Sequence, residues 1–346
     1  MVAWGVISCS MALVTTAREF YLLRFLLGVA EAGFFPGMIL YLRNWFPRGA
    51  RARAVAWFMT ANPLAGVIGG PLSGALLGLH QFGIAGWQWL FVMEGLPAVG
   101  LALVVLVTLK DNPGQAAWLR SEEKLWLVAT LEQECEQQAK ITGSDAWAAF
   151  LSWRIWVLTV VFFGLTTSAY GIVLWMPNFI HSLSAASNME IGVISVIPYV
   201  ATAIAMVLVG MHSDRTGERH WHLAGSAFAA AAALLMAAYT RSIVPALAAV
   251  SLGLMATFSM QGPFWATATS LLSGTAAAAG IALINSFGNL GGFFGPYIIG
   301  VKRSSGAGFR GGMLIIAIFL VLAGVLASVV QPPRERPAPI QPNPLQ

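Results

Sequence analysis

Two ionisable residues stand inside an apolar stretch near the start of the chain. Residues 24 to 36 have the sequence RFLLGVAEAGFFP, which places Arg24 and Glu31 within a segment, residues 20–46, that is long enough to cross a bilayer. Charged groups at such depth are costly and by default mark a substrate or ion pathway. Seven residues are close to two helical turns, so both side chains share one helix face, about 10 Å apart along the axis. A structural ion pair, or an Arg24 that extends to the interface, is the alternative.

The composition is that of an integral membrane protein. Hydrophobic residues make up 58% of the 346 residues and charged residues only 10%, whereas roughly a quarter of a soluble domain is charged. The apolar spans are ten candidate membrane helices: 2–16, 20–46, 53–79, 88–109, 155–179, 190–211, 221–239, 243–271, 276–300 and 311–330. The positions of the basic residues argue for orientation in a lipid bilayer rather than for binding to nucleic acid.

The basic residues predict which side of the membrane each loop faces. With a cytoplasmic N-terminus, thirteen of the nineteen lysines and arginines fall in cytoplasmic loops. Five fall outside, namely Arg18, Arg241, Lys302, Arg303 and Arg310. Both termini are therefore predicted to be cytoplasmic, although the cluster of Lys302, Arg303 and Arg310 runs against the rule.

A charged segment, residues 110–154, divides the chain into two parts. Within it, the run SEEKLWLVATLEQE at 121–134 has helical periodicity and predicts an amphipathic helix on the membrane surface. Four apolar spans precede this segment and six follow it. The predicted all-α organisation comprises an incomplete N-terminal helical bundle over 1–109, a cytoplasmic central loop over 110–154, a C-terminal six-helix bundle over 155–330 and a disordered cytoplasmic tail over 331–346.

Several stretches of the chain match one family in order. The first four are RFLLGVAEAGFFPG at 24–37, WFPRGARARA at 45–54, WQWLFVMEGLPA at 87–98 and DNPGQAAWLRSEEK at 111–124. They are followed by YGIVLWMP at 170–177 and GIALINSFGNLGGFFGP at 280–296. The chain thus resembles the major facilitator superfamily, and within it the anion:cation symporters that import organic anions such as tartrate, sugar acids and phthalate. The resemblance runs from the family's third helix onward and lacks the first two.

The resemblance implies roles for the charged pair. Arg24 matches the position where an arginine lies near the anionic substrate, and Glu31 matches the position implicated in proton coupling. A protonated Glu31 would release its attraction for Arg24 and leave the guanidinium free for a substrate carboxylate. The implied function is proton-coupled uptake of a small organic anion by alternating access, carried out by a monomer in the bacterial cytoplasmic membrane.

Uncharged residues complete the expected substrate contacts. By resemblance, Asn285 hydrogen-bonds substrate hydroxyls, and Asn289 shares its helix face; amide bonds between helices are the alternative for both. Tyr170 and Trp175 lie where the family's seventh helix lines the cavity, unless they serve packing or the interfacial aromatic belt. Weaker candidates of the same kind are Gln261, Trp265 and Asn62.

The stretch GMHSDRTGER at 210–219 resembles the superfamily's gating loop, with the pattern G-x-x-x-D-R-x-G. The residues that the resemblance assigns to the loop are Gly210, Asp214, Arg215, Gly217 and Arg219. Asp214 can accept hydrogen bonds at a neighbouring helix end, the two arginines supply charge-assisted partners, and Gly217 permits a tight turn. A solvated turn that holds a helix pair is the alternative.

No cofactor or metal site is predicted. The five histidines lack the spacing of metal ligands, and neither of the two cysteines suggests a disulfide or a metal site. No phosphate-binding glycine loop supports ATP-driven transport, and no cluster of His, Asp or Ser supports a membrane enzyme. One rival stays open, a truncated member of the same fold that acts as a fragment or sensor and does not transport.

Overall fold

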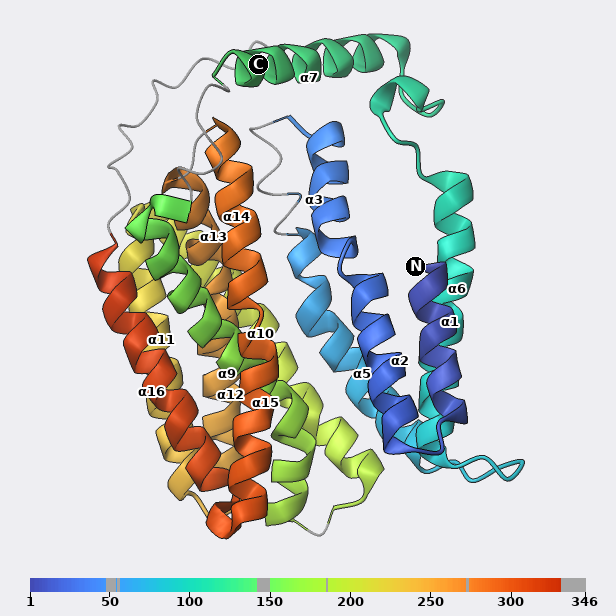
Figure 1. Cartoon of the computed structure of the whole chain (residues 1–346), viewed down its shortest axis with the longest axis vertical. Coiled ribbons are helices and arrows are strands. Elements are labelled where there is room, and N and C mark those ends of the chain that lie inside the picture. The colour runs from blue at the N-terminus through green and yellow to red at the C-terminus, as the bar shows by residue number, and fades with distance from the viewer. Residues whose placement is uncertain (48–53, 55–56, 142–149, 185, 272–273, 331–346) are drawn as a thin grey trace. The chain divides into compact units, whose positions relative to one another are not determined.

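The structure is a computed structural model in which helices make up almost the whole chain (Figure 1). It describes residues 1–47, 54, 57–141, 150–184, 186–271 and 274–330, and within these ranges it contains no strand. The prediction of an all-α polytopic fold is confirmed. The chain forms two compact units, Met1–Thr142 with Pro177–Ala203 and Gly143–Met176 with Ile204–Gln346. The predicted C-terminal tail, 331–346, lies outside the described residues.

The first unit contains the N-terminal helices. In chain order these are α1 (Val2–Ser10), α2 (Ala17–Glu31), α3 (Phe34–Trp45), α5 (Ala61–Leu77), α6 (Gly86–Thr108) and α7 (Ser121–Ile141), with 3-10 turns at Met11–Leu13 and Pro113–Gln115. The adjoining parts of α9 (Trp153–Leu183) and α10 (Asn188–Thr216) complete the unit. Helix α7 occupies the segment predicted to be amphipathic and leaves Leu125 and Trp126 exposed.

The second unit contains the remainder of α9 and α10 and all later helices. These are α11 (Arg219–Tyr239), α12 (Ile243–Ser259), α13 (Gln261–Leu271), α14 (Gly274–Gly288), α15 (Gly291–Lys302), the kinked turn η3 (Arg303–Ala307) and α16 (Gly308–Val329). Helix α11 packs along α12 and α16. The buried face of α11 is rich in alanine, with Ala227, Ala230 and Ala233 fully buried. Small side chains of this kind let membrane helices approach one another closely.

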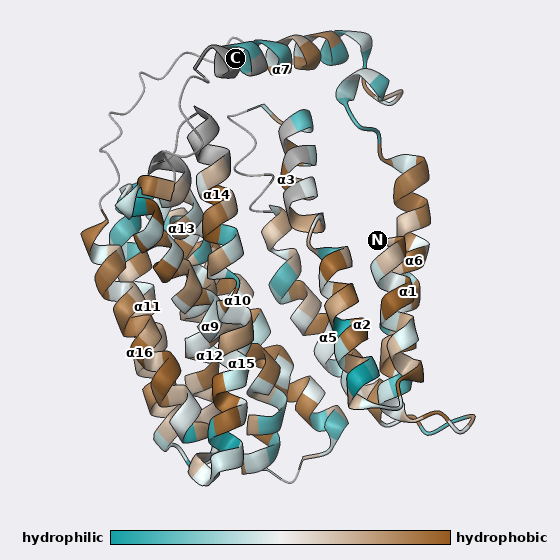
Figure 2. Ribbon diagram, viewed as in Figure 1, coloured by the Kyte–Doolittle hydropathy of each residue, from teal (hydrophilic) through white to brown (hydrophobic). Residues whose placement is uncertain are grey.

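The outer faces of the helices are apolar. Leu106 and Val107 on α6 and Ile318 on α16 are exposed, and Figure 2 shows the corresponding ribbons largely in the hydrophobic colour. A soluble protein rarely exposes contiguous apolar surface of this extent. The pattern is the one expected where lipid rather than water surrounds the helices.

Within the described residues, six helical segments are long and apolar enough to cross a membrane. They are Gly86–Thr108, Trp153–Leu183, Asn188–Ser213, Arg219–Tyr239, Ile243–Ala268 and Ala279–Val329. They correspond to seven of the ten predicted spans, because 276–300 and 311–330 both overlap the last segment. The other three predicted spans, 2–16, 20–46 and 53–79, contain shorter helices.

The predicted span 20–46 is two helices rather than one. Helix α2 ends at Glu31 and α3 begins at Phe34, while Ala32 and Gly33 between them keep right-handed helical angles. Pro36 accounts for the interruption, because a proline has no N–H to donate to the carbonyl one turn earlier. Glu31 is therefore placed at a helix end instead of in the middle of a continuous helix.

A capping box fixes the start of α2. The Thr16 hydroxyl accepts a hydrogen bond from the backbone N–H of Glu19, and the Glu19 carboxylate accepts from the backbone N–H groups of Thr15 and Thr16. These bonds, that from Thr15 first, lower the pKa of Glu19. The carboxylate satisfies N–H groups that a helix N-terminus would otherwise leave unpaired. The helix that carries Arg24 thus begins at a defined residue.

Helices α5 and α10 pack backbone to backbone within the first unit. A Cβ atom added at Gly192 would overlap the carbonyl oxygen of Gly70, and one added at Gly74 would lie 2.6 Å from the carbonyl oxygen of Asn188. By contrast, nothing lies within 4 Å of a Cβ added at Gly69. Glycine at the contact positions therefore sets how closely the two helices approach.

Candidate functional site

Arg24 lies on α2 with its guanidinium over two aromatic rings. Its Cζ atom is 5.3 Å from the ring centroid of Phe20, one turn earlier, and 5.8 Å from that of Phe91 on α6. The side chain is exposed and forms no ion pair with the described part of the chain. An aromatic face attracts the cation through its quadrupole and does not use its N–H groups. The N–H donors of Arg24 are therefore available to a carboxylate.

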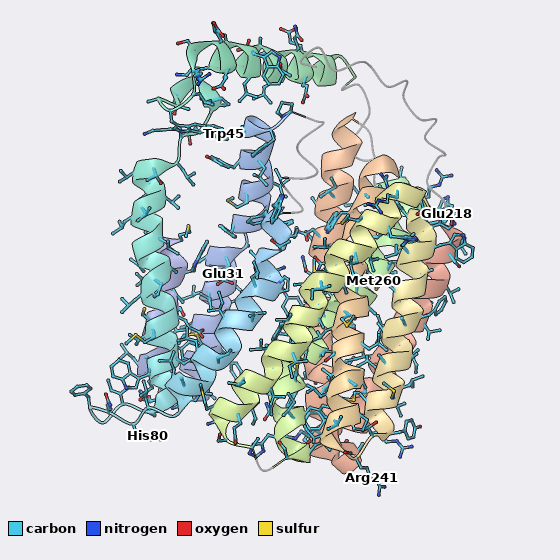
Figure 3. All side chains as sticks on the ribbon, turned by 180° about the vertical axis from the view of Figure 1, so that it is seen from behind. Glu31, Trp45, His80, Glu218, Arg241 and Met260 are labelled. Carbon is cyan, nitrogen blue, oxygen red and sulfur yellow. The ribbon has the colours of Figure 1, made fainter. Side chains whose placement is uncertain are left out.

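Glu31 ends α2, at the interruption before α3. Its carboxylate is exposed and has no hydrogen bond or ion pair among the described residues. Figure 3 shows Glu31 well away from both ends of the first unit's helices. Its spacing from Arg24 keeps both side chains on one side of α2, roughly 10 Å apart along the axis. The two charges are thus close to one another without forming an ion pair.

A second helix interruption lies in the second unit. Helix α14 ends at Gly288 and α15 begins at Gly291. The Thr166 hydroxyl on α9 donates a hydrogen bond to the carbonyl oxygen of Gly288, with 2.6 Å between the two oxygen atoms. Carbonyl groups at a helix end need partners from outside the helix. Here α9 supplies that partner from a residue that is only 4% exposed.

Two amides and a tyrosine gather at this interruption. The Asn289 amide donates from Nδ2 to Oδ1 of Asn285 at 2.7 Å, so the two residues predicted to share a helix face are joined. Tyr170, one turn after Thr166 on α9, covers Gly292 of α15, where an added Cβ would meet its ring at 3.1 Å. The Tyr170 side chain is 48% exposed. The amides keep further N–H and C=O groups, which suit a hydroxyl or a carboxylate.

Trp175 and Gln261 are not joined to these amides. The Trp175 indole N–H donates to the carbonyl oxygen of Pro296 at 2.9 Å, and the guanidinium of Arg303 covers its ring. Trp175 thus connects α9 to α15. Gln261 begins α13, is half-buried and makes no hydrogen bond with the described part of the chain. No hydrogen bond or ring contact connects Trp175 or Gln261 to Asn285 among the described residues.

The predicted gating loop joins α10 to α11. Gly210, Asp214 and Arg215 lie in the last part of α10, and Arg219 begins α11. As predicted, Gly217 makes the tight turn, with a φ of 69° that favours glycine. Arg219 donates from Nη1 to the carbonyl oxygen of Ala266 on α13 at 3.4 Å. The role predicted for the Asp214 side chain lies outside what the structure describes.

The sequence profile of the Major Facilitator Superfamily matches residues 1–296 and, in a second match, residues 186–345. The two matches together cover nearly the whole chain. The chain belongs to the Major Facilitator Superfamily.

Similar proteins and structures agree with this membership. The "Putative tartrate transporter" of Agrobacterium vitis is 45% identical over 332 residues, which are 95% of this chain and 73% of that protein. The "Quinolone resistance transporter" of Acinetobacter baumannii is 38% identical over 97% of this chain and 78% of its own length. A bacterial homolog of the human lysosomal transporter Spinster, solved in an inward-facing and unoccupied conformation, has the same fold. Its TM-score is 0.72 at 18% identity, covering 95% of this chain and 80% of that one.

Superfamily membership makes the chain an integral membrane protein of transporter type and not an enzyme. In the described part of the chain no group of three or more His, Cys, Asp or Glu side chains could hold a metal ion. A close pair of histidines does occur at the loop between α10 and α11, where Nδ1 of His212 and Nε2 of His222 lie 2.6 Å apart across the turn.

The weaker sequence candidates have other surroundings. Asn62 is exposed at the start of α5. Trp265 packs against Phe162, with 5.2 Å between ring centroids. Sequence reasoning missed Thr166, although the run Thr166–Thr167–Ser168 in an otherwise apolar helix signalled hydroxyl partners one turn before Tyr170.

Proposed function

We propose that this superfamily member carries a small organic anion, such as tartrate, a sugar acid or a related carboxylate, into the cell together with protons. The observation that carries the proposal is Arg24, a guanidinium on an apolar helix that has aromatic neighbours but no acidic partner among the described residues. A cation in such a place suits an anion that binds and leaves. Similarity at 45% identity to a relative named for tartrate transport supports a carboxylate as the substrate.

Glu31 is the proposed proton carrier. A charge roughly 10 Å away along the helix changes the energy of a carboxylate at Arg24 by about 0.4 kcal/mol in water and about 1.7 kcal/mol at an effective dielectric constant of 20. Protonation of Glu31 removes its repulsion of the substrate and so strengthens anion binding by a factor of about 2 to 20. By reciprocity, a bound anion favours protonation of Glu31 to the same degree, which is the coupling that symport needs.

The amide and tyrosine cluster of the second unit is the proposed partner for substrate hydroxyls. Asn285, Asn289 and Tyr170 lie beside an interrupted helix, and such interruptions commonly form binding sites in transporters. Alternating access of two helical bundles is the proposed route, with the loop between α10 and α11 as a gate. The protein is proposed to act as a monomer in the bacterial cytoplasmic membrane, with both termini in the cytoplasm as the basic residues predict.

The experiment uses purified protein in proteoliposomes. Labelled tartrate, a sugar acid and an aromatic acid are offered with a proton gradient, and each measurement is repeated with an uncoupler. Accumulation of one of these anions that collapses with the uncoupler supports the proposal. Absence of uptake for every anion contradicts it and favours a member of the fold that does not transport.

Two variants and a matched control test the residue roles. Arg24→Lys keeps the charge but loses the bidentate geometry, so uptake should fall by about tenfold or more. Glu31→Gln should lose the accumulation that depends on the proton gradient while it keeps anion exchange. Arg18→Lys makes the same change in the first turn of α2, at an exposed residue, and should leave uptake normal. Near-normal uptake by Arg24→Lys would contradict the proposed role of Arg24 in binding the substrate carboxylate.

A further inference from the structure

Basic residues gather at one end of the second unit, where α11 finishes and α15 turns into α16. They are Arg241, Lys302, Arg303 and Arg310. The end of α11 and the start of α16 are in contact here. The Cζ atom of Arg310 lies 4.2 Å from the ring centroid of Tyr239, the last residue of α11. The 21 residues of α11 extend about 31 Å. The cluster is therefore distant from the gating loop, as the positions of Glu218 and Arg241 in Figure 3 illustrate.

This cluster has aromatic neighbours, and it forms no ion pair with an acid among the described residues. The chain contains no Asp or Glu between Glu218 and Glu335. The Cζ atom of Arg303 instead lies 5.4 Å from the ring centroid of Trp175 and 5.1 Å from that of Phe309. Aromatic faces hold a guanidinium without neutralising it, so its charge and its N–H edge stay available to an anion.

Two aromatic rings in contact with each other restrict the Arg303 side chain. The Trp175 ring is anchored by its hydrogen bond to Pro296, and it meets the Phe309 ring edge to face with 5.8 Å between centroids. Between Arg303 and Phe309 the chain reverses through η3, where Gly306 has a φ of 83°. The guanidinium is thus preorganised rather than free on a loop.

We propose that Arg303, held by Trp175 and Phe309, binds the carboxylate of the organic anion at this end of the second unit. The inference rests on the proposed function, and it adds a capture site distinct from Arg24. In the predicted orientation this end faces the outside of the cell. A concentrated positive charge there raises the local concentration of an anionic substrate and its rate of entry. A lipid phosphate shares the same chemistry, and the experiment separates the two sources.

A local fluorescent reporter provides the test. Ser305 is exposed within η3, so a fluorophore on Ser305→Cys, with Cys9→Ala and Cys135→Ser, reports on this site and not on the rest of the protein. The labelled protein in phosphatidylcholine nanodiscs is titrated with tartrate and, at equal ionic strength, with chloride. A saturable response to tartrate alone is expected. Arg303→Gln should raise the half-saturating concentration about fivefold, the effect of one lost exposed charge pair.

Arg241→Gln is the matched control. It removes the same charge at the same end of the unit from an exposed residue with no aromatic contact among the described residues, so its shift should stay below about twofold. If Arg303→Gln and Arg241→Gln raise the half-saturating tartrate concentration equally, the proposed site is wrong. The anion would then be attracted by the overall positive charge of this end and not by Arg303. Absence of a saturable tartrate response would overturn it as well, as would a response to added phosphatidylglycerol but not to tartrate.

Protein folding and the proposed function are controlled separately. Phe309→Leu keeps Arg303 and removes one ring, and it should give an intermediate shift while thermal unfolding shows a folded protein. If the reporter titrates but the proteoliposomes take up no anion, the capture site stands and the proposed function fails. If uptake is normal but the reporter does not respond, the capture site fails and the proposed function stands.

Discussion

Thr166→Val tests whether one hydroxyl holds the helix interruption beside the amide cluster. The Thr166 hydroxyl lies 2.6 Å from the carbonyl oxygen of Gly288, and the side chain is 4% exposed. Valine has nearly the same shape but places a methyl group where the donor was. The carbonyl of Gly288 then loses its partner in a place that water does not reach.

The expected cost follows from this geometry. A hydrogen bond between membrane helices is worth about 0.6 to 1.7 kcal/mol, and a buried carbonyl left without a donor costs about 1 to 3 kcal/mol. The methyl group also needs more room than a hydrogen-bonded oxygen, which adds strain. For a chain of 346 residues, a loss of about 2 kcal/mol in the free energy of unfolding corresponds to a fall of roughly 3 °C in Tm. Uptake should fall too, because Asn285 and Asn289 flank Gly288.

The neighbouring threonine is the control. Thr167 is 0% exposed, and its hydroxyl has no hydrogen-bond partner among the described residues. Thr167→Val removes a buried polar group that gains nothing from the fold, so Tm should stay unchanged or rise, by at most about 1 kcal/mol of stability. The test compares the Tm of the two purified variants and their uptake in proteoliposomes. Equal Tm changes for the two variants would refute the argument that the bond from Thr166 to Gly288 stabilises the interruption.

Two further predictions concern packing in the first unit. Gly192→Ala should lower Tm because the added Cβ overlaps the carbonyl of Gly70, at about 1 to 3 kcal/mol. Gly69→Ala meets nothing within 4 Å and should be neutral or stabilising by up to about 1 kcal/mol; equal unfolding curves would contradict the close contact of α5 with α10. Trp118→Ala should loosen the segment before α7, because Trp118 stacks on Trp45 with centroids 5.6 Å apart. Limited proteolysis should then cut that segment faster, and an unchanged rate would show that the stack does not hold it.

Much of the architecture could be predicted from the sequence, because lipid imposes a local rule. In a membrane helix a residue must be apolar or have a polar partner, so length and hydropathy located the helices. The motif around Arg24 and Glu31 pointed to the correct family. The span 20–46 shows the limit of that rule. Hydropathy made it continuous, whereas Pro36 interrupts its hydrogen-bond ladder and leaves Glu31 at a helix end.

The candidate site could be predicted only by residue type. The sequence placed Asn285 and Asn289 on one helix face, and the structure joins them directly. The sequence also predicted Trp175 to line the cavity. In the structure the indole N–H of Trp175 donates to the carbonyl oxygen of Pro296. A side chain's type states which hydrogen bonds it can make, and nothing in a local window states which partner it will find.

The sequence by itself determined that this protein is a membrane transporter of the major facilitator fold, with Arg24 and Glu31 about two helical turns apart in an apolar stretch. The tertiary structure decided which polar groups are already used. Thr166 reaches a carbonyl 122 positions away, and Arg303 lies on a ring of a helix far earlier in the chain. Such contacts depend on how whole helices pack, since hydropathy and periodicity are properties of neighbouring residues while hydrogen bonds and cation–π contacts are set by distance in space.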